Sequence, residues 1–334
     1  MRKYNIPVFV PHKGCPYDCV FCNQRKITGN IKETTPDDVT KTITSYLETL
    51  PKTDRNIEVA FFGGSFTGIP IDEQSALMER VLPYINDGII DGIRLSTRPD
   101  YITREILDNL KKYNVTTIEL GVQSMDDRVL KASNRGHNSK TVENAVSLIK
   151  EYGFSLGLQM MTGLPGDTDE RSVETAGKII ALNPDFVRIY PTLVIKDTFL
   201  EKMYKSGEYE PQSLDNAVIL SKKLLLMFED VGIGVIRIGL QPTEEINEGA
   251  SVVAGPFHSS FGELVIGSIY YDIIKNALQN VHSDVTLYVN PSEISKAVGN
   301  RRSNIELLEK ELKINICVKG DTNLKKREVR YECF

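Results

Sequence analysis

The sequence predicts an α/β protein: a partial (βα)6 TIM-type barrel of parallel strands, followed by a small C-terminal α/β domain. Two observations support the barrel. Short β-rich apolar runs alternate with helical patterns along most of the 334 residues, and six such runs occur before the pattern changes. No GxGxxG motif of the nucleotide-binding type accompanies them. An incomplete barrel therefore fits better than a doubly wound sheet, and its functional residues should lie at the C-terminal ends of the strands.

Six β-rich runs are the expected strands of the barrel. They are Ile6–Val10, Glu58–Phe62, Gly92–Ser96, Thr117–Gly121, Ser155–Met161 and Phe186–Tyr190. Helices should begin after Thr35, Thr103 and Thr168, because each of these threonines is followed by acidic residues in the pattern of an N-cap. A long helix over 214–230 precedes another strand at 235–238, after which the βα alternation ends.

The C-terminal part reads as a separate small unit, so we predict one domain over 1–245 and another over 246–334. Its pattern is strand 285–289, helix 291–298, the turn Gly299–Arg302, helix 303–312 and strand 314–318. From Asn290 onward there are ten Lys and Arg against seven Asp and Glu, although the whole chain has a formal charge of -5. Contacts with a nucleic acid should therefore lie within 290–334.

The composition excludes two classes of protein. No apolar run approaches the roughly 20 residues needed to cross a bilayer, and the N-terminal residues lack the apolar segment of a signal peptide. These features predict a cytoplasmic protein with no membrane segment. Three of the five cysteines lie within eight residues, which argues against a disulfide framework and for a metal or catalytic use.

Cys15, Cys19 and Cys22 directly follow the first predicted strand, at the expected mouth of the barrel. Three thiolates on a short loop can bind three irons of a cubane cluster and leave the fourth iron open to a small molecule. The alternative is a zinc site with His12 as the fourth ligand. It is disfavoured because structural zinc sites usually combine two separate pairs of ligands.

The spacing CxxxCxxC after the first strand of a βα series resembles the radical S-adenosylmethionine (SAM) superfamily. Two further segments, Thr97–Asp100 and Asn134–His137, resemble the catalytic subunit of Elongator and the oxygen-independent coproporphyrinogen oxidases. The resemblance implies an enzyme in which the three cysteines hold a 4Fe-4S cluster. The cluster reductively cleaves SAM to a 5'-deoxyadenosyl radical. It also implies an external one-electron donor of the flavodoxin or ferredoxin type.

The resemblance assigns SAM contacts to positions at the strand ends. They are Phe21 against adenine, the glycine-rich turn with Gly63, Gly64, Ser65 and Thr67, and Ser96, Gln123, Arg135 and Gln159. An arginine can bind the carboxylate of SAM in bidentate geometry, which suits Arg135. The related oxidases have a carboxylate where Gln159 stands, so ribose recognition here relies on an amide. Tyr190 and His258 are the candidate catalytic residues.

The turn at 299–302 resembles the GxxG loop of a KH RNA-binding module, with Arg302 in place of the second glycine. A small α/β cap without RNA binding is the alternative. The favoured hypothesis is radical modification of RNA, with a transfer RNA as the expected substrate. Two alternatives remain: radical chemistry on a small metabolite or tetrapyrrole, and an iron-sulfur or zinc module that binds RNA without catalysis.

Overall fold

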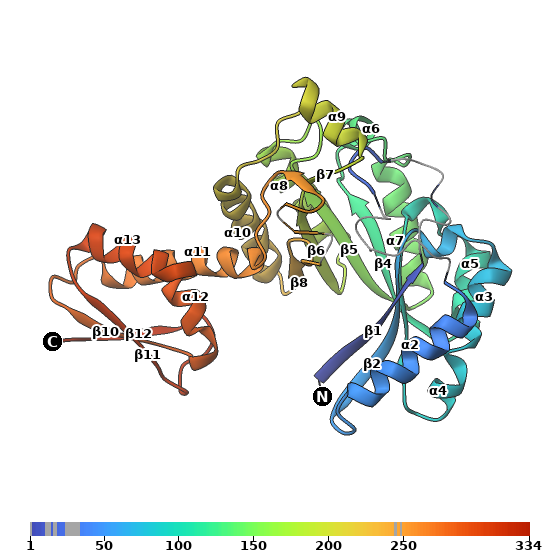
Figure 1. Cartoon of the computed structure of the whole chain (residues 1–334), viewed down its shortest axis with the longest axis horizontal. Helices are drawn as coiled ribbons and strands as arrows, with labels where there is room; N and C mark the ends of the chain where they lie inside the picture. The colour runs from blue at the N-terminus through green and yellow to red at the C-terminus, as the bar shows by residue number, and fades with distance from the viewer. Residues whose placement is uncertain (1, 11–14, 16–18, 24–33, 244–245, 248) are drawn as a thin grey trace. The chain divides into compact units, whose positions relative to one another are not determined.

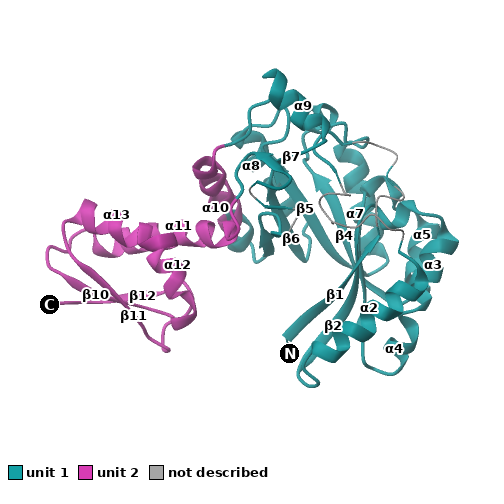
Figure 2. Cartoon of the chain, viewed as in Figure 1, with its two compact units in different colours: residues 1–212, 227–257 teal, residues 213–226, 258–334 magenta. Residues whose placement is uncertain are grey.

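The computed structural model describes residues 2–10, 15, 19–23, 34–243, 246–247 and 249–334. The chain forms two compact units (Figure 2). Unit 1 comprises residues 1–212 and 227–257, and unit 2 comprises 213–226 and 258–334. The domain boundary expected after residue 245 falls inside the second segment of unit 1. We describe each unit by itself.

Unit 1 is built on a seven-stranded sheet in which all neighbours are parallel, in the order β1-β2-β3-β4-β5-β6-β8. The strands are β1 Arg2–Val10, β2 Arg55–Gly63, β3 Gly92–Thr97, β4 Val115–Gln123, β5 Ser155–Thr162, β6 Phe186–Pro191 and β8 Gly234–Ile238. The sheet curls into an open half-barrel (Figure 1). The predicted partial barrel is confirmed, and it has a seventh strand because β8 pairs with β6.

Helices connect successive strands of the sheet, as expected for right-handed βα crossovers. They are α2 Pro36–Thr49, α3 Ile71–Glu79, α4 Leu82–Asn86, α5 Arg104–Lys112, α6 Asp127–Ala132, α7 Ser139–Glu151, α8 Asp169–Ala181, α9 Phe199–Ser206 and α10 Leu214–Asp230. The predicted caps are confirmed: Thr35, Thr103 and Thr168 each accept a hydrogen bond from the first turn of the helix that follows. None of the helices in the described part of the chain combines the length and apolarity that a membrane span requires.

A two-stranded antiparallel sheet in unit 1 joins β7 Val194–Ile195 to β9 Val252–Ala254. Val194 is fully buried in a small apolar cluster with Val20, Leu200 and Tyr209. The backbone around Val20 is held twice, since its N–H donates to the carbonyl of Ser133 and its carbonyl accepts from the N–H of Leu200. The described part of the cysteine segment is therefore anchored to residues more than 100 positions later in the chain.

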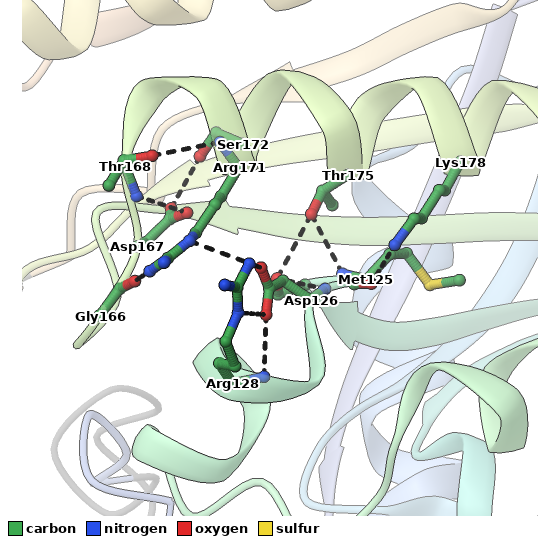
Figure 3. A network of polar contacts seen from close by, with 11 residues as sticks. Met125, Asp126, Arg128, Gly166, Asp167, Thr168, Arg171, Ser172, Thr175 and Lys178 are labelled. Atoms are coloured by element: carbon green, nitrogen blue, oxygen red, sulfur yellow. Dashed lines mark hydrogen bonds and ion pairs between the residues drawn. The ribbon is translucent and has the colours of Figure 1, made fainter.

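A polar network ties the end of β4 to α8 and to the loop before it (Figure 3). Arg128 donates to both carboxylate oxygens of Asp126, which also lies 3.5 Å from Nε of Arg171. The hydrogen bonds from Arg128 lower the pKa of Asp126 to about 2. Thr175 of α8 accepts a hydrogen bond from the backbone N–H of Met125 at 3.1 Å. These contacts fix the start of α6, the helix that precedes Arg135.

Unit 2 contains a three-stranded sheet in the order β11-β10-β12, in which β10 is parallel to β11 and antiparallel to β12. Its elements are α11 Phe261–Leu278, β10 Val285–Val289, α12 Ile294–Val298, α13 Ser303–Leu312, β11 Ile316–Gly320 and β12 Val329–Cys333. Apolar side chains of α11, α12 and α13 pack on the sheet in one core. The predicted strand-helix-helix-strand pattern is present, with β11 two residues later than expected and β12 in addition.

Candidate active site

The strand ends of the half-barrel bring together most of the predicted site residues. Gly63 and Gln123 are the last residues of β2 and β4, Ser96 is the penultimate residue of β3, and Tyr190 is the penultimate residue of β6. Gln159 lies deeper in β5, paired with Gly121. Because the strands are parallel, these ends lie at one edge of the sheet, where βα barrels carry their chemistry.

Cys19 is the most enclosed of the three cysteines, with 5% of its surface exposed, whereas Cys15 and Cys22 are half-buried. The N–H of Cys22 donates to the carbonyl of Cys19 at 2.9 Å, which forms a tight turn. Phe21 packs against the apolar cluster that contains Val194. Residues 11–14 and 16–18 of the cysteine loop, including His12, lie outside the described residues.

Two guanidinium groups face the sulfur of Cys19. Nη1 of Arg135 lies 3.4 Å from Cys19 Sγ, and Nη1 of Arg98 lies 3.9 Å from the same atom. Burial raises the pKa of the Cys15 thiol, while the charges of Arg98 and Arg135 act in the opposite direction. A negatively charged group bound by these cysteines would therefore meet two buried cations. Arg98 was not assigned a role from the sequence, although it follows β3 at the same edge of the sheet.

The glycine-rich turn after β2 is shaped by Gly63, whose φ is +113°. A Cβ at this position would lie 2.7 Å from the carbonyl oxygen of Val10, so only glycine fits. The N–H of Gly64 donates to that same oxygen at 3.0 Å. The turn therefore locks the end of β2 to the end of β1, the strand from which the cysteine loop departs.

The hydroxyl groups of Ser65 and Thr67 form hydrogen bonds within the protein. Both lie in hydrogen-bond distance of the Thr97 hydroxyl, at 2.8 and 2.6 Å, and all three side chains are buried. The structure therefore places these two predicted SAM contacts where they brace the end of β3. Their backbone groups remain the candidates for contact with a ligand.

Several buried polar atoms at the mouth have no hydrogen-bond partner among the described residues. They are Oγ of Ser96, Oε1 of Gln123 and Nε of Arg135. Gln123 also has a left-handed backbone with φ of 68°, at a β-bulge in β4. Such orphaned groups are costly unless a ligand or water satisfies them, so they fit a polar ligand with carboxylate and amino groups.

Gly121 makes room for two of these side chains. A Cβ there would lie 2.7 Å from Nη2 of Arg135 and 2.9 Å from Nε2 of Gln123. Nη2 of Arg135 instead donates to the Gly121 carbonyl at 2.6 Å. The predicted pair of Gln123 and Arg135 thus converges over one glycine, and their contact with SAM stays a prediction.

A charged network that the sequence did not reveal fills the inner face of the barrel below this edge. Glu119 is fully buried and accepts from Nε of Arg188 at 2.6 Å and from Nη2 of Arg94 at 3.0 Å. Arg94 also pairs with Glu58 at 3.4 Å. The signal that could have predicted it is a single charged residue between apolar neighbours in each of β3, β4 and β6. Burial raises the pKa of Tyr190, although nearby Arg188 opposes this shift.

His258 belongs to unit 2, whereas the strand ends of the half-barrel belong to unit 1. Its Nδ1 accepts a hydrogen bond from the N–H of Ser260 at 3.1 Å, and its Nε2 lies 3.3 Å from Nδ2 of Asn300. The imidazole of His258 thus contacts its own loop at Ser260 and the turn at 299–302. Its catalytic role stays a prediction, as does that of Tyr190.

In the described part of the chain, no three histidine, cysteine or acidic side chains lie close enough to share a single metal ion. A cubane cluster makes a different demand, because each thiolate binds a different iron. The donor set of three cysteines beside two buried arginines fits a cluster of net negative charge.

His137 lies beside Arg135 and is nine-tenths buried. Burial and, to a lesser degree, the charge of Arg135 lower the pKa of its imidazole to about 4. The unfolded chain has a histidine pKa near 6.5 and binds a proton below that pH, whereas the folded chain does not until about pH 4. Stability should therefore fall as the pH drops from about 6.5 to 4.

Urea unfolding of the wild type and of His137→Gln across this pH range tests the expectation. Relative to the variant, the wild type should lose up to about 3 kcal/mol between pH 6.5 and 4. If the free energy of unfolding depends on pH in the same way for both proteins, His137 binds its proton equally well in the folded and the unfolded chain.

The half-barrel, the cysteine turn after β1 and the orphaned polar groups at the strand ends define an enzyme that binds a cofactor at the mouth of a βα barrel. Comparison with known families gives the class. A sequence model described as the Radical SAM superfamily matches residues 9–179, and one described as the Radical_SAM C-terminal domain matches 184–271. The chain belongs to the radical SAM superfamily. It is therefore an enzyme that uses a 4Fe-4S cluster and SAM.

Two curated relatives share about a third of their residues with this chain in the aligned regions. Elongator complex protein 3 of Saccharomyces cerevisiae is 32% identical over 51% of this chain and 34% of its own length. The tRNA uridine(34) acetyltransferase of Methanocaldococcus infernus is 30% identical over 63% of this chain and 42% of its own length. The chain thus spans less than half the length of these two relatives.

Two solved structures share the fold. The archaeal Methanocaldococcus infernus Elp3 aligns with a TM-score of 0.64 and 24% identity, over 83% of this chain and 63% of that chain. Coproporphyrinogen III oxidase (HemN) of Escherichia coli aligns with a TM-score of 0.51 and 19% identity, over 69% of this chain and 53% of that chain. At these identities the likeness establishes the fold alone.

Proposed function

We propose that this enzyme cleaves SAM at the mouth of the half-barrel and uses the resulting radical to modify a base of RNA, with a transfer RNA as substrate. The observation that carries the proposal is the 30% identity to the tRNA uridine(34) acetyltransferase over 63% of this chain. That relative is named for action on a tRNA uridine. A cytoplasmic location is part of the same proposal, because transfer RNA is found there.

In this proposal Cys15, Cys19 and Cys22 hold the cluster. When bound, the cluster supplies the electron that breaks the sulfonium bond of SAM and so generates a 5'-deoxyadenosyl radical. An external one-electron donor of the flavodoxin or ferredoxin type provides that electron. The protein's own contribution is to bind, orient and exclude water.

The orphaned groups provide the orientation. Nε of Arg135 and Oε1 of Gln123 are buried without a hydrogen-bond partner in the described residues, which supports their assignment to the carboxylate and amino groups of the methionyl end. Backbone atoms of Gly63 and Gly64 can approach the same end closely. Phe21 offers an apolar surface for adenine, and Gln159 offers an amide to the ribose. Tyr190, farther along the sheet near Arg188, is the candidate for contact with the substrate.

The turn of unit 2 is the candidate contact with RNA. Arg301 and Arg302 are exposed and both have left-handed backbones, with φ of 50° and 65°. Such conformations are unfavourable for arginine by about 1–2 kcal/mol per residue, and they occur preferentially where function requires them. Gly299 is required because a Cβ there would lie 2.7 Å from the N–H nitrogen of Asn304. The turn presents two arginines, which suits phosphate contacts in a KH-like clamp.

The proposal predicts that RNA stimulates cleavage of SAM. After anaerobic reconstitution and reduction with dithionite, 5'-deoxyadenosine should form faster with unmodified tRNA transcripts than without RNA. Deuterium placed on the target base should appear in 5'-deoxyadenosine if the radical abstracts hydrogen from it. If cleavage is active but indifferent to RNA, and a tetrapyrrole or metabolite stimulates it instead, the RNA substrate is wrong.

The double variant Arg301→Ala/Arg302→Ala tests the contact itself. Hydrogen bonds to charged groups contribute on the order of 1.5–3 kcal/mol, so we expect at least about tenfold weaker tRNA binding. The slope of log affinity against log salt should fall by about 1.4, or about 0.7 per lost contact with single-stranded RNA. The matched control Arg80→Ala/Arg104→Ala removes two exposed arginines of unit 1 and should change neither quantity.

A further inference from the structure

The guanidinium of Arg98 is enclosed beside the cysteine segment, with only 3% of the side chain exposed. Its Nε and Nη2 donate to the two carboxylate oxygens of Asp100 at 2.9 and 3.0 Å. Nη2 also donates to the carbonyl of Arg135 at 2.6 Å. These bonds fix the plane of the guanidinium and direct Nη1 towards Cys19 Sγ, 3.9 Å away.

The backbone of Arg98 is fixed as well. Its N–H donates to the hydroxyl of Ser65 at 3.3 Å, and this hydroxyl belongs to the buried cluster at the end of β3. Arg98 is therefore held at both ends, between the glycine-rich turn and the segment that carries Arg135. A side chain held in this way has little freedom to leave the sulfur when a ligand binds.

Among the described residues, the charged side chains joined to one another beside Cys19 carry a net positive charge. Arg98 and Arg135 each carry one positive charge, and Asp100 carries one negative charge. His137 is neutral at physiological pH because its pKa is about 4. The described groups thus leave a net positive charge beside the Cys19 sulfur, in an enclosed region where charges interact strongly.

A cluster at this site gains one negative charge when it is reduced. Buried positive charge and N–H groups directed at a ligand sulfur stabilise the reduced form and raise the reduction potential. Arg98 would act through Cys19, because its Nη1 is directed at the Cys19 sulfur. The effect of Arg98 differs from that of Arg135, whose Nε is left for a ligand.

We infer that Arg98, oriented by Asp100, is a positioning residue that acts through Cys19 to raise the reduction potential of the cluster. The step concerned adds one electron from the low-potential donor to the oxidised cluster, with no bond made or broken and no proton moved. This inference rests on the proposed role of Cys19 as a cluster ligand. It does not depend on RNA as the substrate.

The test is a potentiometric titration of the reconstituted cluster in the full chain, without SAM. Electron paramagnetic resonance measures the fraction of reduced cluster at each potential. At the wild-type midpoint, Arg98→Gln should lower the ratio of reduced to oxidised cluster at least tenfold, a shift of about 59 mV for one electron. Arg104→Gln is the matched control. It also removes an arginine that is bidentate to a carboxylate, but on the outer surface, and should leave the midpoint unchanged.

Asp100→Asn provides a second measurement of opposite sign. It keeps the arginine and removes the negative charge, so the midpoint should move to a higher potential. A midpoint equal to that of the wild type in Arg98→Gln with full iron content would overturn the inference. If Arg98→Gln fails to hold a cluster, Asp100→Asn decides: an upward shift supports the inference, and no shift or a downward one refutes it.

A wrong assignment of Cys19 as a cluster ligand would give a different experimental result. If Cys19→Ala still assembles a complete cluster, then Cys19 is not a ligand and the basis of the inference is lost. If Cys19→Ala loses the cluster while Arg98→Gln leaves the potential unchanged, the ligand assignment stands and only the role of Arg98 is wrong.

Discussion

Replacing Cys19 with alanine is expected to abolish 5'-deoxyadenosine formation. The substitution removes one of three proposed thiolates, and it is the one that both arginines face, at 3.4 and 3.9 Å from Arg135 and Arg98. Without this anionic ligand, two buried cations remain beside an incomplete donor set. Iron content after anaerobic reconstitution should fall below that of a four-iron cluster, and dithionite with SAM should yield no product above background.

The matched control is Cys317→Ala. Cys317 is an exposed cysteine on β11 of unit 2, so its loss should leave iron content and cleavage unchanged. A Cys19→Ala enzyme that retains a four-iron cluster and cleaves SAM would exclude Cys19 as a ligand. Comparable losses in both variants would point to general damage by the substitution rather than to ligand loss.

Glu119→Gln is expected to destabilise unit 1 by about 3–5 kcal/mol, although the side chain keeps its size. Glu119 is fully buried and pairs with both Arg94 and Arg188. Removing one partner of a buried ionic network leaves uncompensated charge, and this is much more costly than the original network is favourable. Urea unfolding at pH 7 measures the loss as a lower midpoint.

Glu151→Gln serves as the control for this prediction. Glu151 forms a bidentate pair with Arg104 on the exposed surface, where water solvates both partners after the change. We expect no measurable change in the unfolding midpoint. If Glu119→Gln also unfolds at the wild-type midpoint, Arg94 and Arg188 have other sources of compensation, and the inner network is not a determinant of barrel stability.

The barrel could be predicted because its central strands β3 and β4 are buried along most of their length, and because its strands read as apolar runs bounded by helix caps. The strands that were not predicted lack such apolar runs. Strands β7 and β9 contain two and three residues, too few for any periodicity. Strand β12 is mostly exposed, so it lacks an alternating apolar pattern. The early start predicted for β11 arises because Ile314, which precedes the strand, is itself buried.

The candidate site could be predicted where a motif at a strand end already specifies the geometry. The convergence of Gln123 and Arg135 follows from the position of β4 and of the helix after it. The role of Arg98 does not follow in this way, because its direction depends on bonds to Asp100 and to the Arg135 carbonyl. The hydroxyls of Ser65 and Thr67 could equally face a ligand or Thr97, and only side-chain packing decides between these.

The anchoring of the cysteine segment to distant parts of unit 1 has a consequence for the order of events during synthesis. The backbone of Val20 bonds to Ser133 and to Leu200, and Phe21 packs near Val253 and Ala254. Because the cysteines are made before Ser133, Leu200 and Ala254, the described surroundings of the cysteine segment are complete only after residue 254 has been made. If these cysteines hold the cluster, we expect iron and sulfide to enter the finished pocket late, after residue 254 has been made.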